Sequence, residues 1–243
     1  MKLVGDVQAL LNGTPQLGQL LNLGSFEDFP QLAGALFSQL CNSDAIGTVV
    51  QSVYASDSQL VETTLYDIAE TARRNFEPGG EAATLLFSRG VQAIMAHRVA
   101  HKLWVDGDTN LALAIKVSCG RAFATDIHPA AKIGAGLWLD HGLGFVVGET
   151  SVIGEDVSIW HNVTLGSTLN DSGAHRHPHV GSGAVIGAGA ILLGGITIGA
   201  RANIAAGSIV VDDIPEGMVA VGSKASVRGP SRVSFARTTG TRS

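Results

Sequence analysis

Histidine, aspartate and arginine residues gather in two short stretches of the second half of the chain. Asp140 and His141 follow an aliphatic residue in the first stretch, and Arg176 and His177 lie in the second. An imidazole whose pKa is near neutrality can take the proton of an attacking hydroxyl group. A carboxylate on the other ring nitrogen would fix its tautomer, and a guanidinium would hold a substrate carboxylate by two hydrogen bonds. These residue types suit acyl transfer to a hydroxyl, while their spacing alone is equally typical of solvated turn residues.

A metal site is a second interpretation of the histidines, because three of them from different coils could bind zinc. His175, His177 and His179 share one loop, which makes them a poor fixed tetrahedral set. His97 and His101 are four residues apart on a predicted helix without a third ligand, so we interpret them as helix-packing residues. No metal is therefore expected.

A six-residue repeat provides the frame for these side chains. Aliphatic residues recur at every sixth position, with a slip of two residues near 141–146 and a longer break at 166–179. Six extended residues of about 3.3 Å each form one flat face, three faces close a triangular coil, and stacked coils bury the aliphatic side chains. The repeat predicts a parallel β-helix with two functional loops. Its thirteen positions are Ile127, Ile133, Leu139, Val147, Ile153, Ile159, Leu165, Val180, Ile186, Leu192, Ile198, Ile204 and Val210.

Composition narrows the class of protein. A formal net charge of −5 on 243 residues argues against binding to nucleic acid or to an anionic membrane surface. Only 15% of the residues are charged, which indicates apolar surface buried between subunits. Two cysteines, the absence of an 18-residue apolar run and the absence of a signal-peptide pattern predict a cytoplasmic protein.

The first half of the chain is predicted to be helical, so the fold class is α+β. Apolar spacings of three and four indicate helices at 46–76, 81–105 and 111–117, and a weaker pattern before them is broken at Gly13-Thr14-Pro15. Three parts are expected: an N-terminal helical domain at 1–122, the β-helix at 123–227 and a flexible tail at 228–243.

The run DIHPAAKIGAGLWLDHGLGFVVGETSVIGEDVSIWHNVTLG, from Asp126 to Gly166, resembles bacterial serine O-acetyltransferases of the hexapeptide-repeat acyltransferase superfamily. Arg176-His177-Pro178, with IGAGA and IAAGS after it, strengthens the resemblance, which reaches back to about residue 60. The resemblance implies a left-handed β-helix, trimers that often pair into hexamers, and active sites between neighbouring β-helices. It also implies acetyl transfer from acetyl-CoA to L-serine, the first step of cysteine synthesis, with L-cysteine as feedback inhibitor.

The resemblance also assigns roles at the matching positions. His141 is the general base on the serine hydroxyl, and Asp126 is its dyad partner. Asp140 holds the serine ammonium group, Arg176 binds the serine carboxylate, and His177 adds a hydrogen-bond donor near the reacting centre.

Further positions follow less directly from the family pattern. Glu77 stands where the family has an aspartate that faces the substrate amine, so the charge is kept on a side chain one methylene longer. Acetyl-CoA is expected along the coils near Ala188 and Ala206, with Thr168 near the thiol and Lys224 near the phosphates. His161 is expected one coil above His141, as a surface residue and not as a catalyst.

Departures from the family pattern keep other functions open. Gly166-Ser167-Thr168-Leu169 replaces GGTG, and the following loop is one residue longer. With Glu77, this leaves a related acetyltransferase for homoserine or a sugar as the alternative, although Arg176 favours an amino acid. A zinc enzyme resembling γ-class carbonic anhydrases and a scaffold without turnover are the remaining readings. A cysteine synthase complex is not expected, because the sequence ends Arg242-Ser243 where docking relatives have isoleucine.

Overall fold

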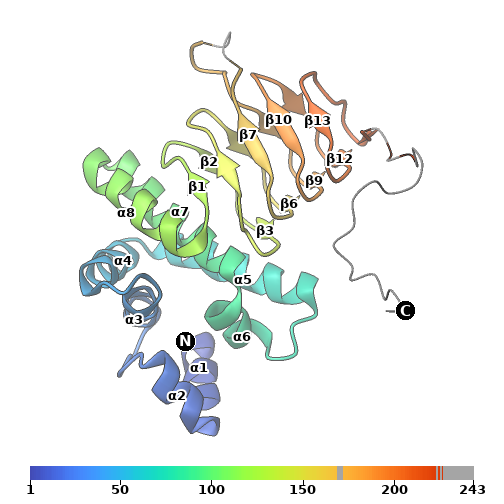
Figure 1. Ribbon diagram of the computed structural model, residues 1–243. Helices are drawn as coiled ribbons and strands as arrows, with labels where there is room; N and C mark the ends of the chain where they lie inside the picture. Colours follow the sequence, from blue (N-terminus) through green and yellow to red (C-terminus); the bar gives the residue numbers. More distant parts are fainter. Residues whose placement is uncertain (169–171, 223, 225, 227–243) are drawn as a thin grey trace, which may run out of the picture.

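The computed structural model describes residues 1–168, 172–222, 224 and 226. Helices make up the first half, and short strands make up the second half (Figure 1). The helices are α1 (Lys2–Gly13), α2 (Pro15–Leu21), α3 (Phe29–Cys41), α4 (Asp44–Ser56), α5 (Ser58–Asn75), α6 (Gly80–Phe87), α7 (Arg89–Val105) and α8 (Thr109–Phe123). Among the described residues, none of the helices is both long and apolar enough to cross a lipid bilayer.

Two helices that the sequence predicts as continuous are each divided in two. The range 46–76 was expected as one helix, but Asp57 ends α4 and caps α5, its side chain accepting a hydrogen bond of 2.9 Å from the N–H of Leu60. The range 81–105 is divided at Ser88, whose hydroxyl accepts from Val91 N–H at the start of α7. Both residues are good N-caps because they satisfy backbone N–H groups that a new helix leaves unpaired.

The strands form three parallel sheets that wind as a β-helix. The strands are β1 (Asp126–Ile127), β2 (Lys132–Ile133), β3 (Trp138–Leu139), β4 (Val146–Val147), β5 (Val152–Ile153), β6 (Ser158–Ile159), β7 (Thr164–Gly166), β8 (His179–Val180), β9 (Val185–Ile186), β10 (Ile191–Leu193), β11 (Thr197–Ile198), β12 (Asn203–Ile204), β13 (Ile209–Val210) and β14 (Val219–Ala220). We call the sheets face A (β1-β4-β7-β10-β13), face B (β2-β5-β8-β11) and face C (β3-β6-β9-β12-β14).

The hexad positions are confirmed as the core of the β-helix. Each of the thirteen lies in a strand and is at most 8% exposed. Leu139 pairs with Ile159 and then Ile159 with Ile186, as one residue per coil should. One strand, β14, follows the predicted end of the repeat at Val210 and pairs with β12. The repeat in the sequence therefore predicted the register of the coils as well as their existence.

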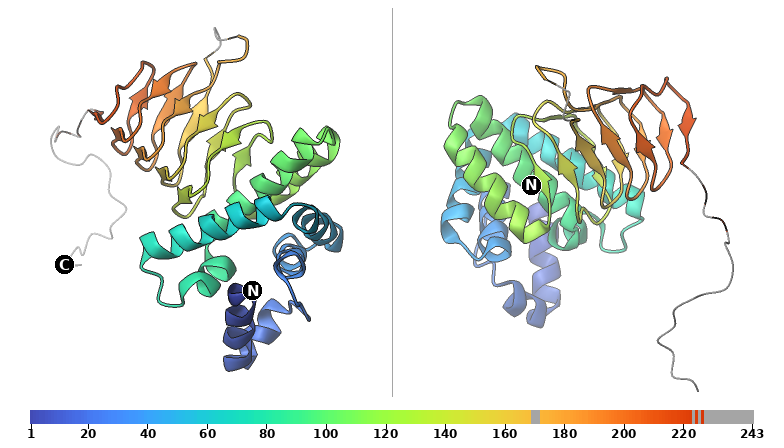
Figure 2. Two further views of the ribbon diagram at one scale, coloured as in Figure 1. Left: turned by 180° about the vertical axis from the view of Figure 1, so that it is seen from behind. Right: turned by 45° about the horizontal axis from the view of Figure 1, so that its top comes forward.

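The helical domain covers the end of the solenoid that β1, β2 and β3 form (Figures 1 and 2). Asp67 of α5 and Arg98 of α7 form an ion pair of 3.0 Å, and their side chains are only 2% and 8% exposed. Asp67 accepts a hydrogen bond of 2.7 Å from the N–H of Gly136, and Arg98 donates to the carbonyl oxygens of Ile133 and Gly134. Burial raises the pKa of the Asp67 carboxyl, while Arg98 acts to lower it.

A glycine sets the distance between α7 and the first coil. A Cβ atom on Gly90 would overlap the backbone carbonyl of Leu139, the last residue of β3. The same helix surface meets the next turn, since a Cβ on Gly142 would lie 3.4 Å from the Cα of Gly90. The helix therefore lies directly against the residues that flank Asp140 and His141.

We expect Gly90→Ala to destabilise the protein, because the added methyl group has to push α7 away from β3. Overpacking of this kind lowers the free energy of unfolding by about 1–3 kcal/mol. Gly5→Ala is the matched control, because Gly5 also lies in a helix but has open space around its position. It should leave stability unchanged or raise it by roughly 0.5–1 kcal/mol. Urea denaturation of both variants measures the difference, and equal stabilities would contradict the proposed close contact.

Candidate active site

The edge between faces C and A carries His141 on an inserted turn. Turns on this edge normally span four residues, as at 160–163, 187–190 and 205–208, whereas the first turn spans six, 140–145. His141 has a φ of +60°. Such a left-handed backbone costs a residue with a side chain about 1–2 kcal/mol. The insertion therefore holds this histidine out of the regular coil.

The predicted stacking of His161 on His141 is confirmed. Their ring centroids are 5.7 Å apart, as the pairing of Leu139 with Ile159 requires. Nε2 of His141 lies 3.5 Å from a carboxylate oxygen of Asp140, and the His141 side chain is 67% exposed. The imidazole thus has a carboxylate neighbour on one side and open space for a second reactant.

The helical domain contributes one wall of the cleft at His141. A cavity of about 410 Å³ is lined by Glu77, Asp140 and His141, together with Asn75, Phe87, Ser88, Arg89, Leu139 and Leu143. Glu77 lies between α5 and α6, and its N–H donates to the carbonyl of Ala72 over 3.1 Å. Two carboxylates thus line the cavity that holds the imidazole.

Arg176 and His177 lie on a different edge, between faces A and B. Thr150 arranges this part of the chain: its hydroxyl oxygen accepts hydrogen bonds from the N–H groups of Arg176 (3.2 Å) and His177 (3.1 Å). The ring of His177 crosses Gly148 so closely that a Cβ there would overlap it. Nδ1 of His177 accepts from the N–H of Thr150 over 3.2 Å and lies 2.9 Å from the hydroxyl oxygen.

Arg176 is already paired within the chain. Its guanidinium forms an ion pair with Glu149, and this hydrogen bond holds the pKa of the Glu149 carboxyl below its usual range. Both side chains are partly exposed, so the fork of Arg176 keeps donors available to a further carboxylate. No hydrogen bond or ion pair joins Arg176 to His141 in the described chain, as expected for residues on different edges of the triangular β-helix.

Asp126 lies on face A at the start of β1. Its carboxylate forms an ion pair with Lys116 of α8 and is 60% exposed. In the part of the chain that is described, neither a hydrogen bond nor an ion pair joins Asp126 to His141. The carboxylate that pairs with His141 there is that of Asp140. The structure thus leaves the predicted dyad open, and it offers Asp140 as a second partner.

The residues expected to bind acetyl-CoA lie mostly above His141. Ala188 and Ala206 occupy the same edge two and three coils above His141. The N–H of Gly189 donates to the carbonyl of His161, and the N–H of Gly207 donates to the carbonyl of Ala188. Side chains would meet nothing within 4 Å at Gly189 and Gly207, so this edge is open. Thr168 lies on the edge between faces A and B. Lys224 is exposed, and residue 223 and the predicted tail 228–243 lie outside the described residues.

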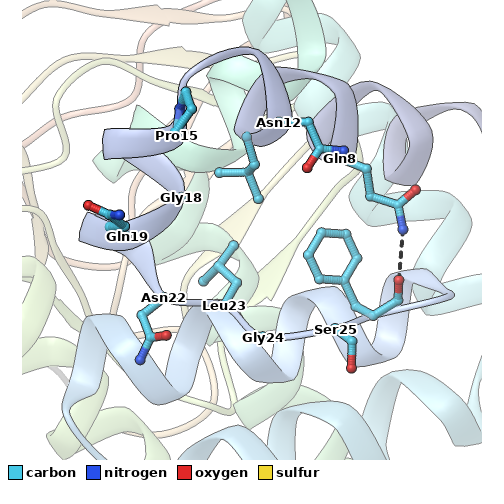
Figure 3. Close-up of a pocket in the computed structure, with 11 residues that line it drawn as sticks. Gln8, Asn12, Pro15, Gly18, Gln19, Asn22, Leu23, Gly24 and Ser25 are labelled. Carbon is cyan, nitrogen blue, oxygen red and sulfur yellow. Dashed lines mark hydrogen bonds between the residues drawn. The ribbon is translucent and has the colours of Figure 1, made fainter.

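Another cavity lies far from these side chains. It has a volume of about 720 Å³ and is enclosed by α1, α2 and the segment after them (Figure 3). Gln8 closes one side of it by donating to the carbonyl of Phe26 over 2.9 Å. None of its lining residues is charged. It therefore offers neither a base nor a charged contact for an amino acid.

Sequence reasoning missed several residues that position this site. Thr150 and Glu149 were not singled out, although both follow Gly148 directly in the repeat. Gly90 and Lys116 lie on helices, where their patterns indicate only solvent exposure or packing. The signal that could have indicated them was the run Gly148-Glu149-Thr150. It forms the turn between β4 and β5, on the same edge that carries the long loop one coil later.

Known proteins with similar sequences and structures identify the family. No protein-family model matches the chain. Serine acetyltransferase of Escherichia coli (strain K12) is 42% identical over 208 residues, which are 86% of this chain and 76% of that protein. Serine acetyltransferase of Neisseria gonorrhoeae, solved in complex with serine, is 35% identical with a TM-score of 0.81, and the match covers 93% of this chain and 95% of that one.

A third similar protein was solved with a second ligand. Serine acetyltransferase of Brucella abortus strain S19, in complex with coenzyme A, is 32% identical with a TM-score of 0.82, and the match covers 93% of both chains. These neighbours confirm the predicted left-handed parallel β-helix after an N-terminal helical domain. With this identity and this shared arrangement of helices and coils, the chain belongs to the serine acetyltransferase family.

Proposed function

We propose that this protein transfers the acetyl group of acetyl-CoA to the hydroxyl of L-serine, with His141 as the general base. The imidazole takes the hydroxyl proton while the serine oxygen attacks the thioester carbonyl. The tetrahedral intermediate then collapses, and the departing CoA sulfur recovers the proton from the imidazolium. The products are O-acetyl-L-serine and CoA, and the reaction opens cysteine biosynthesis. The observation that carries this proposal is the shared cavity of His141, Asp140 and Glu77.

The charges around His141 suit one end of a serine zwitterion. Glu77 and Asp140 both line the cavity, so an ammonium group would find two carboxylates beside the base. Arg176, the predicted partner of the serine carboxylate, lies on another edge, between faces A and B. Among the residues that line the cavity at His141, the cation is Arg89 at the start of α7. Asp126 remains the proposed dyad partner of His141. A carboxylate oxygen of Asp140 lies 3.5 Å from Nε2 of His141.

A neighbouring copy of the chain completes the proposed site. Face A lies between the edge of His141 and the edge of Arg176. It exposes the aliphatic side chains of Val146, Ile191 and Ile209, which are typical of a buried interface. Packing face A into a closed ring of identical subunits would bring the two edges together. We therefore propose a homotrimer, alone or paired into a hexamer, with serine bound between neighbours.

The cosubstrate, the regulator and the location complete the proposal. Acetyl-CoA would lie along the open edge at Ala188 and Ala206, with Thr168 contributed by the neighbouring copy. L-cysteine, the end product, is the expected feedback inhibitor. A cytoplasmic location is proposed because the chain has only two cysteines and so lacks the disulfide framework typical of secreted proteins.

The choice of acceptor is tested by CoA thiol release. Acetyl-CoA and chelator-treated protein are incubated with L-serine, L-homoserine or a thiogalactoside. We expect release with L-serine, because the cavity pairs carboxylates for its amine with a hydroxyl-activating base. Release with another acceptor alone would keep the base and overturn the substrate. No release with any acceptor would overturn the proposed activity.

Mixed trimers test whether the site is shared between subunits. His141→Ala and Arg176→Ala should each lose most of the turnover. When the two variants are unfolded together and refolded as random trimers, about one quarter of the sites combine an intact His141 with an intact neighbouring Arg176. We therefore expect roughly a quarter of the wild-type activity in the mixture. Activity that stays at the level of the separate variants would place both residues in one subunit's site.

Thr150 should control how well His177 and Arg176 bind substrate. Because the N–H of Thr150 donates to Nδ1 of His177, the remaining proton lies on Nε2, which can donate to substrate. Thr150→Val keeps the shape but removes the acceptor for two N–H groups. We expect the KM for L-serine to rise roughly 10-fold, which corresponds to about 1.4 kcal/mol. The KM for acetyl-CoA should stay constant, and Thr150→Ser should behave as wild type. Equal KM values for serine in the two variants would contradict this role.

A further inference from the structure

Three potential metal ligands converge beside the inserted turn. One ligand atom each from Asp140, His141 and His161 lies within 4.8 Å of the other two. Asp140 and His141 are consecutive on the inserted turn, while His161 comes from the coil above. The stacking of coils, not chance proximity of flexible side chains, therefore holds the two imidazoles together.

The separations are close to those of a tetrahedral ion. Zinc bonds to nitrogen and oxygen of about 2.0–2.1 Å place neighbouring ligand atoms roughly 3.3 Å apart. Nε2 of His141 and Oδ2 of Asp140 are 3.5 Å apart and already fit this edge length. The three ligand atoms lie within 4.8 Å of one another, so a shift of up to about 1.5 Å would bring the third to this spacing, which side-chain rotation can provide. Exposure of His141 leaves the fourth position open to water.

His161 has no role in the proposed acetyl transfer. Nδ1 of its ring is buried and has no hydrogen-bond partner in the described chain. No hydrogen bond at Nδ1 therefore has to break before the ring turns toward an ion. An imidazole placed over a general base, without a hydrogen bond on Nδ1, is an available ligand.

We propose that Asp140, His141 and His161 form an inhibitory site for a divalent transition-metal ion such as Zn²⁺. Two imidazole nitrogens and one carboxylate favour zinc, cobalt or nickel over magnesium or calcium, which prefer oxygen ligands. The ion takes no part in catalysis. It occupies the nitrogen lone pair of His141, so the imidazole can no longer accept a proton, and a chelator restores it.

The loss of activity rests on the proposed function, whereas binding of the ion does not. Co²⁺ is the probe for binding, because its visible absorption spectrum reports tetrahedral nitrogen and oxygen ligands in the absence of substrates. Zn²⁺ is the probe for inhibition, measured as CoA release. A protein that binds Co²⁺ but never acetylates serine would overturn the proposed function alone.

His161→Gln is the decisive variant, because it removes one ligand and no residue assigned to the reaction. We expect metal-free turnover within about two-fold of wild type, and Co²⁺ and Zn²⁺ affinities at least roughly 100-fold weaker. His175→Gln is the matched control: His175 stacks on His179 at 3.9 Å on another edge, and its loss should leave both affinities unchanged. Zinc inhibition that persists in His161→Gln, or disappears in His175→Gln, would overturn the assignment. Absence of Co²⁺ binding in the wild-type protein would do the same.

Discussion

A buried ion pair joins the helical domain to the first coil, and the cleft depends on that junction. The strands β1, β2 and β3 each end a sheet, so part of their backbone has no neighbouring coil to bond. Asp67 and Arg98 supply partners to three such positions, Ile133, Gly134 and Gly136. Unpaired strand edges invite aggregation, and solenoids need a cap for this reason. Breaking a buried ion pair costs about 3–5 kcal/mol, since the remaining charge stays buried without a partner. The pair therefore fixes where α5 and α7 lie, and with them Glu77.

The position of His141 follows from this cap and from a two-residue insertion. The regular edge turn would continue from β3 into β4 in four residues, and the insertion makes it six. His141 has a left-handed conformation within this longer turn, and Gly90 of α7 lies against the turn beside it. A strained residue persists only where its surroundings determine it. The helical domain therefore supports the turn that carries His141.

Sequence alone predicted the solenoid well because every coil repeats one physical requirement. A single aliphatic side chain has to fill the interior of each face, so Ile127 through Val210 mark the register without help from distant residues. The helices were harder, since Asp57 and Ser88 act as caps within apolar patterns that look continuous. The contacts of Thr150 and Glu149 with the long loop could not be predicted from the sequence. They join residues about 27 positions apart across a loop whose path no repeat describes.

The charged residues of the proposed site lie on two different edges of the triangular β-helix, and this separation supports the proposed assembly of several copies. Glu77, Asp140 and His141 line a cavity at one edge, and the guanidinium of Arg176 lies on another edge, where it pairs with Glu149. Within one chain, the cation beside Glu77 and Asp140 is Arg89 at the start of α7, while Arg176 lies a whole face away. In the proposed trimer, a neighbouring copy presents Arg176 to the carboxylate of the bound serine. Because the triangular coil separates these two edges by a whole face, the site that we propose depends on the assembly of several copies.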